Sequence, residues 1–256
     1  MRTSAGGRGR TEPRLVAVCA GYALRACFPT KRRIGLVLPA AGALLFALLA
    51  RLIPDSAPVA LAQVADGGLF GVVLPVGCLV IGDAVLGAEV RSGTLHFTWL
   101  SPVSFATVVA GRWLAGAAVA VAALAVPFGA GAVLAGVPGA VGPLFLAAVA
   151  GSAAYVAVFV LIGALSRRAV VWSLAFVVLG ERLLGTALSG VAQWSPGWEA
   201  RAVYARLGPD AAGTLHRAGL PEGGPAVVRL VIITAVALVI AALRLGRLRL
   251  SGPSGD

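Results

Sequence analysis

The residues that could perform metal or hydrolytic chemistry are few in this chain and lie far apart in its sequence. A zinc site needs several His, Cys or carboxylate ligands close together, whereas the only two histidines are His96 and His216. A phosphate-binding loop needs a glycine-rich turn followed by Lys and Ser or Thr, but the single lysine, Lys31, lies within PTKRR. We therefore expect no metal, no cofactor and no ATPase activity in the chain itself.

One alternative is a membrane-embedded enzyme that works in the segment after residue 188. That segment contains Glu199, Asp210 and His216, which could serve as acids or bases. Their spacing matches no recognisable catalytic arrangement, and such residues are more often solvated loop residues. We therefore favour functions that need no catalysis by this chain.

The composition indicates a membrane protein. The chain has 256 residues, of which 59% are hydrophobic and 12% charged, about half the charged share of an average soluble protein. A bilayer core of about 30 Å requires about 20 mainly apolar helical residues, and six such windows occur. We predict an all-α membrane protein with six transmembrane helices. They run from Ile34 to Ile53, Gly67 to Leu86, Ala106 to Pro127, Pro143 to Leu165, Ala169 to Ala187 and Pro225 to Leu243.

The charge distribution predicts the orientation of these helices. The net charge of +11 could indicate a nucleic-acid partner, but the Lys and Arg residues cluster at the ends of the apolar windows instead of forming one stripe. If the N-terminus is cytoplasmic, most of the basic residues fall on the inner side, as the positive-inside rule requires. We therefore expect cytoplasmic N- and C-termini, no nucleic-acid partner, and a multi-pass location in the cell inner or plasma membrane.

The whole chain is predicted to form one membrane domain. Its parts are a cytoplasmic and interfacial segment at 1–33, a six-helix region at 34–243 with an outer loop at about 188–224, and a cytoplasmic tail at 244–256. The apolar stretch at 14–28 is too short to span a bilayer and precedes KRR, so we interpret it as an N-terminal interfacial helix on the inner surface. A disordered tail is the alternative, whereas the charges argue against a signal peptide.

Asp83 lies within the second predicted span, close to its inner end. An acid at mid-membrane costs about 2.5 to 3.5 kcal/mol on insertion scales, so a partner is expected. Arg91 and Arg112 fall near the same side of the membrane. We expect one of them to pair with Asp83 and fix the inner ends of the second and third spans; the alternative is hydration of Asp83 at the interface.

The connection between the second and third spans, residues 87–104, is longer than a simple turn requires. Gly93 frees the backbone, Thr94 can cap a helix start, LHFTWL can form about two turns beginning at Leu95, and Pro102 ends it. The pattern predicts a short helix held between two breaks. Such an element could lie on the membrane or dock into another protein.

The stretch GDAVLGAEVRSGTLHFTWLSPVSFATVVAGRWLAG resembles the region after the second span of ABC-2 type transporter permeases. That family has an acid near the end of span two, then Glu, a Gly-Thr-Leu triplet, a Ser-Pro-Val-Ser-like segment, and a Gly-Lys pair leading into span three. The corresponding positions here are Asp83, Glu89, Gly93 to Leu95, Pro102 to Ser104, and Gly111 with Arg112. Arg112 replaces the usual Lys and keeps its charge.

A second stretch, VVLGERLLGTALSGVAQWSPGWEARAVYARLG, resembles the outer segment between spans five and six in a subset of these permeases. Glu181 stands where the family often has a Trp-Glu pair, and the Trp is missing here. The resemblance marks Glu181 as a candidate residue of the outer segment. The alternative for Glu181 is an interfacial charge beside Arg182.

The resemblance implies a function. In this family the Gly-Thr-Leu region forms a coupling helix that fits a groove on a separate ATP-binding subunit, and two permease copies sit over two such subunits. By this resemblance, Glu89, Gly93, Thr94, Leu95 and Pro102 would contact the ATPase, which would bind ATP and Mg²⁺. The chain would be the permease subunit of an ABC transporter, with export as the expected direction. Its partners would be that ATPase, a second permease copy, identical or different, and membrane lipids.

A function of another class fits the same short helix. A membrane anchor or assembly factor could bind a cytoplasmic partner through it and transport nothing. If the chain is a permease, the absence of a fixed charge at mid-membrane in the predicted spans favours an amphipathic, lipidic or drug-like cargo over an ion.

Overall fold

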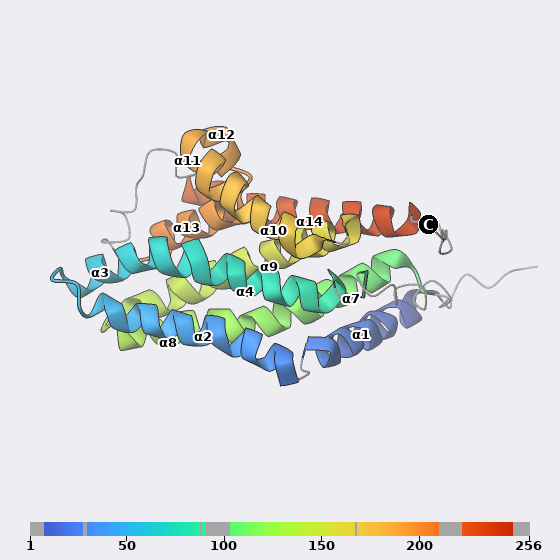
Figure 1. Cartoon of the computed structure of the whole chain (residues 1–256), viewed down its shortest axis with the longest axis horizontal. Helices are drawn as coiled ribbons and strands as arrows, with labels where there is room; N and C mark the ends of the chain where they lie inside the picture. The colour runs from blue at the N-terminus through green and yellow to red at the C-terminus, as the bar shows by residue number, and fades with distance from the viewer. Residues whose placement is uncertain are drawn as a thin grey trace, which may run out of the picture.

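The computed structural model is all-helical in the residues that it describes, which are 8–27, 30–87, 89–90, 103–166, 168–209 and 222–247. The longer helices lie side by side along one long axis, and the shorter helices α11, α12 and α13 gather toward one end of the bundle (Figure 1). The chain begins with two helices, α1 (Arg8–Cys27) and α2 (Thr30–Ala50).

Two long helical runs follow, each interrupted by π-helical turns. The first, the 57–87 helix, consists of α3 (Ala57–Val64), η1 (Ala65–Val73), α4 (Leu74–Gly82) and η2 (Asp83–Gly87). The second, the 105–134 helix, consists of α7 (Phe105–Ala120), η3 (Val121–Ala125) and α8 (Val126–Leu134). A π-helical stretch ends just before Pro75 in the first run and just before Pro127 in the second. Proline has no N–H and crowds the preceding turn, so a wider turn there lets each helix continue.

The second half of the chain wraps short helices around one long central helix. A single 3₁₀ turn, η4 (Pro138–Ala140), leads into α9 (Val141–Leu165). A bent run, the 169–187 helix, consists of α10 (Ala169–Ala175), η5 (Phe176–Leu184) and α11 (Gly185–Ala187). The last elements are α12 (Ser189–Ala192), α13 (Pro196–Leu207) and α14 (Gly223–Arg247).

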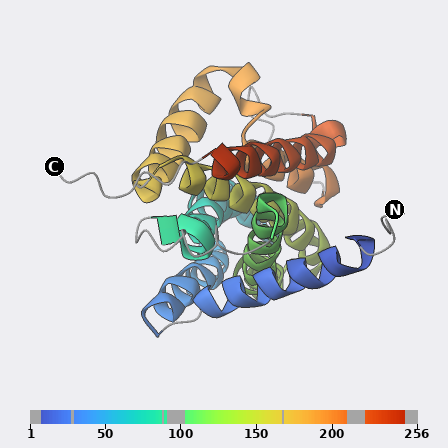
Figure 2. The same ribbon diagram turned by 90° about the vertical axis from the view of Figure 1, so that its right-hand side faces the viewer.

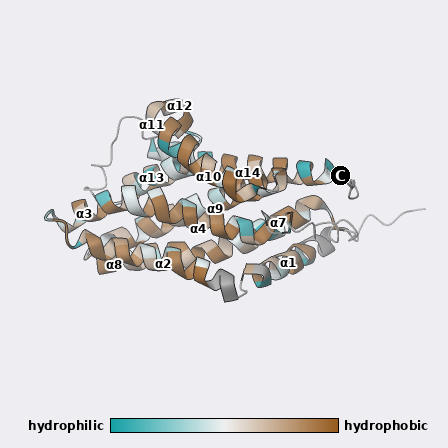
Figure 3. Ribbon diagram, viewed as in Figure 1, coloured by the Kyte–Doolittle hydropathy of each residue, from teal (hydrophilic) through white to brown (hydrophobic). Residues whose placement is uncertain are grey.

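Four helical runs are long and apolar enough to cross a membrane. They are Ala57–Gly87, Phe105–Leu134, Pro138–Leu165 and Gly223–Arg247, and Ile34–Ala50 adds a shorter apolar helix. Figure 3 shows apolar residues along the length of these helices. The expectation of an all-helical, multi-pass membrane protein is therefore confirmed, with four long candidate spans among the described residues where the sequence predicts six.

The core lies around α9, which packs against α14, α13, α4, α7 and α8. Small residues allow these close approaches. A Cβ on Gly82 would lie 2.5 Å from the Cβ of Phe159, and one on Gly151 would lie 2.7 Å from the Cβ of Ala200. Figure 2 shows α14 and α1 on opposite sides of the helix that begins with α7. The expected N-terminal helix thus forms, and it packs along α7.

Two boundaries differ from the sequence expectation in ways that bear on function. The 57–87 helix starts well before Gly67, at a Ser56 cap followed by Pro58, and so places Asp66 inside a long apolar helix. The expected outer loop at about 188–224 contains α13, which is buried from Pro196 to Tyr204. Asp66, Glu199 and Arg201 lower the average hydropathy of these two segments, and each of the three is paired within the bundle.

Candidate functional site

Arg112 joins the end of the 57–87 helix to α7, and we call this contact the junction. Its side chain is 5% exposed, and its Nη2 lies 2.6 Å from Glu89 Oε2. Its Nη1 donates a hydrogen bond of 2.6 Å to the carbonyl oxygen of Val85, in the last turn of that helix. The last carbonyls of a helix lack partners within it, so a guanidinium there satisfies one of them while it neutralises Glu89.

The far end of the 87–104 connection is also fixed to α7. Ser104 is the N-cap of that helix, and its hydroxyl accepts a hydrogen bond from the Thr107 backbone N–H at 3.1 Å. The Ser104 and Thr107 hydroxyls lie 2.7 Å apart. Both ends of the 87–104 connection are therefore fixed to α7, one end through Glu89 and the other through Ser104.

The sequence-predicted contact residues divide into two groups. Glu89 and Arg112 meet at the junction, a pair that the sequence reasoning did not propose. Asp83 begins η2, the turn that also contains Val85, and its expected pairing stays a prediction. Five further candidates lie outside the described residues: Arg91, Gly93, Thr94, Leu95 and Pro102.

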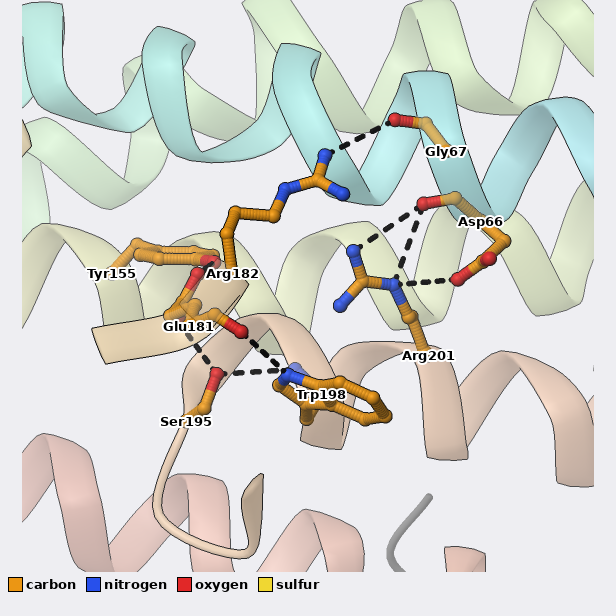
Figure 4. A network of polar contacts seen from close by, with 8 residues as sticks. All are labelled: Asp66, Gly67, Tyr155, Glu181, Arg182, Ser195, Trp198 and Arg201. Carbon is orange, nitrogen blue, oxygen red and sulfur yellow. Dashed lines mark hydrogen bonds and ion pairs between the residues drawn. The ribbon is translucent and has the colours of Figure 1, made fainter. Parts of the chain in front are cut away.

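At the other end of the bundle, Glu181 is buried in a group of polar side chains (Figure 4). Its Oε1 accepts hydrogen bonds from the Ser195 hydroxyl at 2.6 Å and the Gly197 backbone N–H at 3.3 Å. Its Oε2 accepts a hydrogen bond from the Tyr155 hydroxyl. Only 5% of the surface of Glu181 is exposed, so its carboxylate is buried within the protein.

Glu181 holds the start of α13 in place. Ser195 is the N-cap of α13 and Gly197 lies in its first turn, so the carboxylate faces the positive end of the helix dipole. The indole N–H of Trp198 donates a 3.1 Å hydrogen bond to the backbone carbonyl of Glu181. The 169–187 helix and α13 are thus fixed to each other by both side-chain and backbone contacts.

A second buried contact ties α13 to the 57–87 helix. Arg201 Nε lies 2.9 Å from Asp66 Oδ1, and each side chain is 8% exposed. The Arg201 guanidinium also donates to the Asp66 backbone carbonyl and lies 5.5 Å from the centre of the Trp198 ring. Burial lowers the pKa of Arg201, and the charge of Asp66 opposes that shift. Arg182, next to Glu181, donates to the carbonyl of Gly67 at 3.3 Å.

A third contact ties α13 to α14. Arg229 Nη1 lies 3.2 Å from Glu199 Oε1, and the Glu199 side chain is fully buried. Within the described part of the chain, Glu199 Oε2 has no hydrogen-bond partner. Burial raises the pKa of Glu199 to about 7, while the hydrogen bond from Arg229 acts in the opposite direction. Asp210 and His216, the other residues of the enzyme hypothesis, lie outside the described residues.

These contacts make α13 the centre of a structural network. Its polar residues reach three neighbouring helices, and its small Ala200 packs against Gly151 of α9. The Glu181 carboxylate has a donor on each oxygen, which suits a residue that holds a helix more than one that transfers protons. Among the described residues, no group of three or more His, Cys, Asp or Glu side chains could bind a metal ion.

Sequence reasoning missed Asp66, Tyr155 and the partners of Arg201 and Glu199. A usable signal was present in Asp66, an acid directly before an apolar window in a chain with few acids. Its partner Arg201 lies far away in the sequence, and no local pattern links the two residues. Comparison with models of known protein families finds no match, and no curated protein matches the chain.

Proposed function

We propose that this chain is the membrane-spanning permease subunit of an ABC-2 type transporter, and that a separate subunit hydrolyses ATP. The observation that carries the proposal is the junction of Arg112 with Glu89 and the Val85 carbonyl. It lies at the start of the stretch whose residues resemble the family's coupling region. We infer that export is the direction of transport.

The junction suits the transmission of force. A load applied to the 87–104 connection would reach α7 through Arg112 and Ser104, and it would reach the 57–87 helix through the Val85 carbonyl. Charge-assisted hydrogen bonds of this kind are shorter and about twice as strong as neutral ones. Both long helices would therefore move when a partner pulls on the connection.

The proposal includes six spans, with α2 and the 169–187 helix added to the four long candidates. Both termini and the 87–104 connection would then lie in the cytoplasm, and α13 would lie near the outer surface. The positive-inside pattern of the sequence supports this arrangement. Among its described side chains, the 169–187 helix buries a narrow stripe of residues, which leaves apolar surface for lipid or a second permease copy. The stripe consists of Ala169, Ser173, Val177, Glu181 and Gly185.

The cargo would be amphipathic or lipidic. Two pairs of buried charges toward the outer end, Asp66 with Arg201 and Glu199 with Arg229, are engaged with each other, and many of the exposed side chains of the long helices are large and apolar. A free mid-membrane charge would be needed to bind an ion, and such charges are functional when present.

Retention of an ATPase tests the proposal. The protein is solubilised from its native membrane in a mild detergent and captured, and mass spectrometry identifies the proteins retained with it. We expect a P-loop ATPase with the wild type and its loss with Leu95→Asp. The matched control is Leu52→Asp, since Leu52 is 76% exposed in the turn after α2, at the opposite end of the bundle from the junction.

The two alternatives predict different results. A membrane anchor would retain a cytoplasmic partner without ATPase motifs, and that result would overturn the permease proposal. If Leu95→Asp and Leu52→Asp lose the ATPase equally, the contact does not lie in the connection. Gly93→Pro gives a second test: the variant should still insert, bind the ATPase and support ATP hydrolysis, but ATP-driven transport of a fluorescent lipid should be lost.

A further inference from the structure

An apolar groove of about 410 Å³ runs between α7 and α14. Its α7 side is formed by Ala106, Val109 and Ala110, and its α14 side includes Leu238, Val239 and Leu243. The small alanines of α7 leave the space, and the larger residues of α14 form its wall. Val239 and Leu243 are more than half exposed, so the groove is open to its surroundings on the side of these two residues. In a bilayer, acyl chains are the solvent for such a surface.

Positive charge lies at one end of this groove. Val239, Leu243 and Arg247 follow one another at a spacing of four, so Arg247 continues the groove wall one turn beyond Leu243. Arg244 lies beside it in the same last turn. Both arginines are exposed, and neither forms an ion pair with a carboxylate in the part of the chain that the structure describes.

The two helices that line the groove approach each other near these arginines. A Cβ on Gly246 would lie 3.6 Å from the Phe105 ring, so α14 and α7 are in contact where the groove ends. An elongated apolar occupant would therefore lie along the groove with its end at the Arg247 turn. An amphiphile whose polar end is anionic matches this arrangement of apolar length and terminal positive charge.

We propose that the α7–α14 groove binds an anionic phospholipid, with one acyl chain along the groove and the phosphate group against Arg247 and Arg244. Arginine suits this role because its guanidinium presents paired donors to phosphate oxygens. The same arginines also balance the negative end of the α14 dipole, but that role needs no groove and no lipid preference. The proposal rests on the membrane location of the chain and not on the permease assignment.

The test measures lipid binding to the full-length protein by native mass spectrometry. Delipidated protein in detergent is titrated with phosphatidylglycerol or with phosphatidylcholine of the same acyl chains. We expect the first phosphatidylglycerol molecule to bind more tightly than the first phosphatidylcholine molecule. The difference should be roughly fivefold for each arginine that interacts with the lipid headgroup. The double variant Arg244→Gln with Arg247→Gln should bind both lipids alike.

Two further variants separate the groove from general surface charge. Arg51→Gln removes an exposed arginine just after α2, at the opposite end of the bundle, and should keep the preference. Ala106→Phe fills the groove from an exposed position and should weaken the first binding event for both lipids, with an unchanged melting temperature showing that the fold is intact. Equal affinity of the wild type for the two lipids would overturn the proposal. Unchanged lipid binding in Ala106→Phe would also overturn it. A third overturning result is a dimer that binds no lipid in the groove and dissociates in the Val239→Asp variant.

Discussion

Neutralising Asp66 should destabilise the bundle more than any exposed substitution. Asp66→Asn keeps the shape of the side chain but removes the negative charge that compensates the Arg201 guanidinium. Both side chains are buried in the wild type, where each is 8% exposed. Removing one partner of a buried ion pair costs about 3 to 5 kcal/mol, because the other charge loses its compensation. The backbone carbonyl at position 66 would still accept from Arg201, so we expect a loss near the lower end, about 3 kcal/mol.

Arg201→Gln should cost more, about 5 kcal/mol, because it also removes the carbonyl hydrogen bonds and the contact with the Trp198 ring. In the double variant neither charge is left alone, so the two losses should overlap by about 1 to 3 kcal/mol. The free energy of unfolding is measured by SDS titration of the purified protein in mixed micelles, followed by circular dichroism.

The matched control is Asp55→Asn, which makes the same change in an exposed residue that accepts a hydrogen bond from Gln63. It should alter stability by less than about 0.5 kcal/mol. The reasoning is refuted if Asp66→Asn behaves like this control. It is also refuted if the Asp66 and Arg201 losses simply add, because α13 would then not depend on this ion pair.

Two other contacts give predictions of their own. The Glu199 pKa of about 7 lies above its ordinary value of 4.5, so its stabilising contribution is complete below about pH 4.5 and is lost as the pH rises through 7. The wild type should therefore melt at a lower temperature at pH 8 than at pH 5, and Glu199→Gln should remove that part of the decrease; an equal decrease in the variant would contradict this origin. Gly151→Ala would place a methyl group 2.7 Å from the Cβ of Ala200 and should cost about 1 to 3 kcal/mol in the same SDS titration. Gly142→Ala, which has nothing within 4 Å of the new carbon, should leave the free energy of unfolding unchanged. Equal losses of stability in both variants would show that α13 does not pack tightly on α9.

Hydropathy located most helices because it is a local property of the chain. The window from Ala169 to Ala187 coincides with one helical run of the structure, and the N-terminal stretch forms a helix as expected. The average hydropathy of a sequence window did not detect helical segments that contain charged residues. The predicted span begins only at Gly67 because Asp66 interrupts the apolar run, and α13 falls in the predicted outer loop because Glu199, Arg201 and Arg206 lower its hydropathy.

The sequence by itself determined the class of the protein, since 59% hydrophobic residues in long runs can bury their backbone polar groups only as membrane helices. The N-caps Ser104 and Ser195, at which α7 and α13 begin, are seen in the structure and were not identified from the hydropathy of the sequence. Only the tertiary structure decided which charges are compensated. Asp66 with Arg201, Glu199 with Arg229, and Glu89 with Arg112 come from separate helices. Each pair exists because packing around α9 brings those helices together and excludes water from the charges.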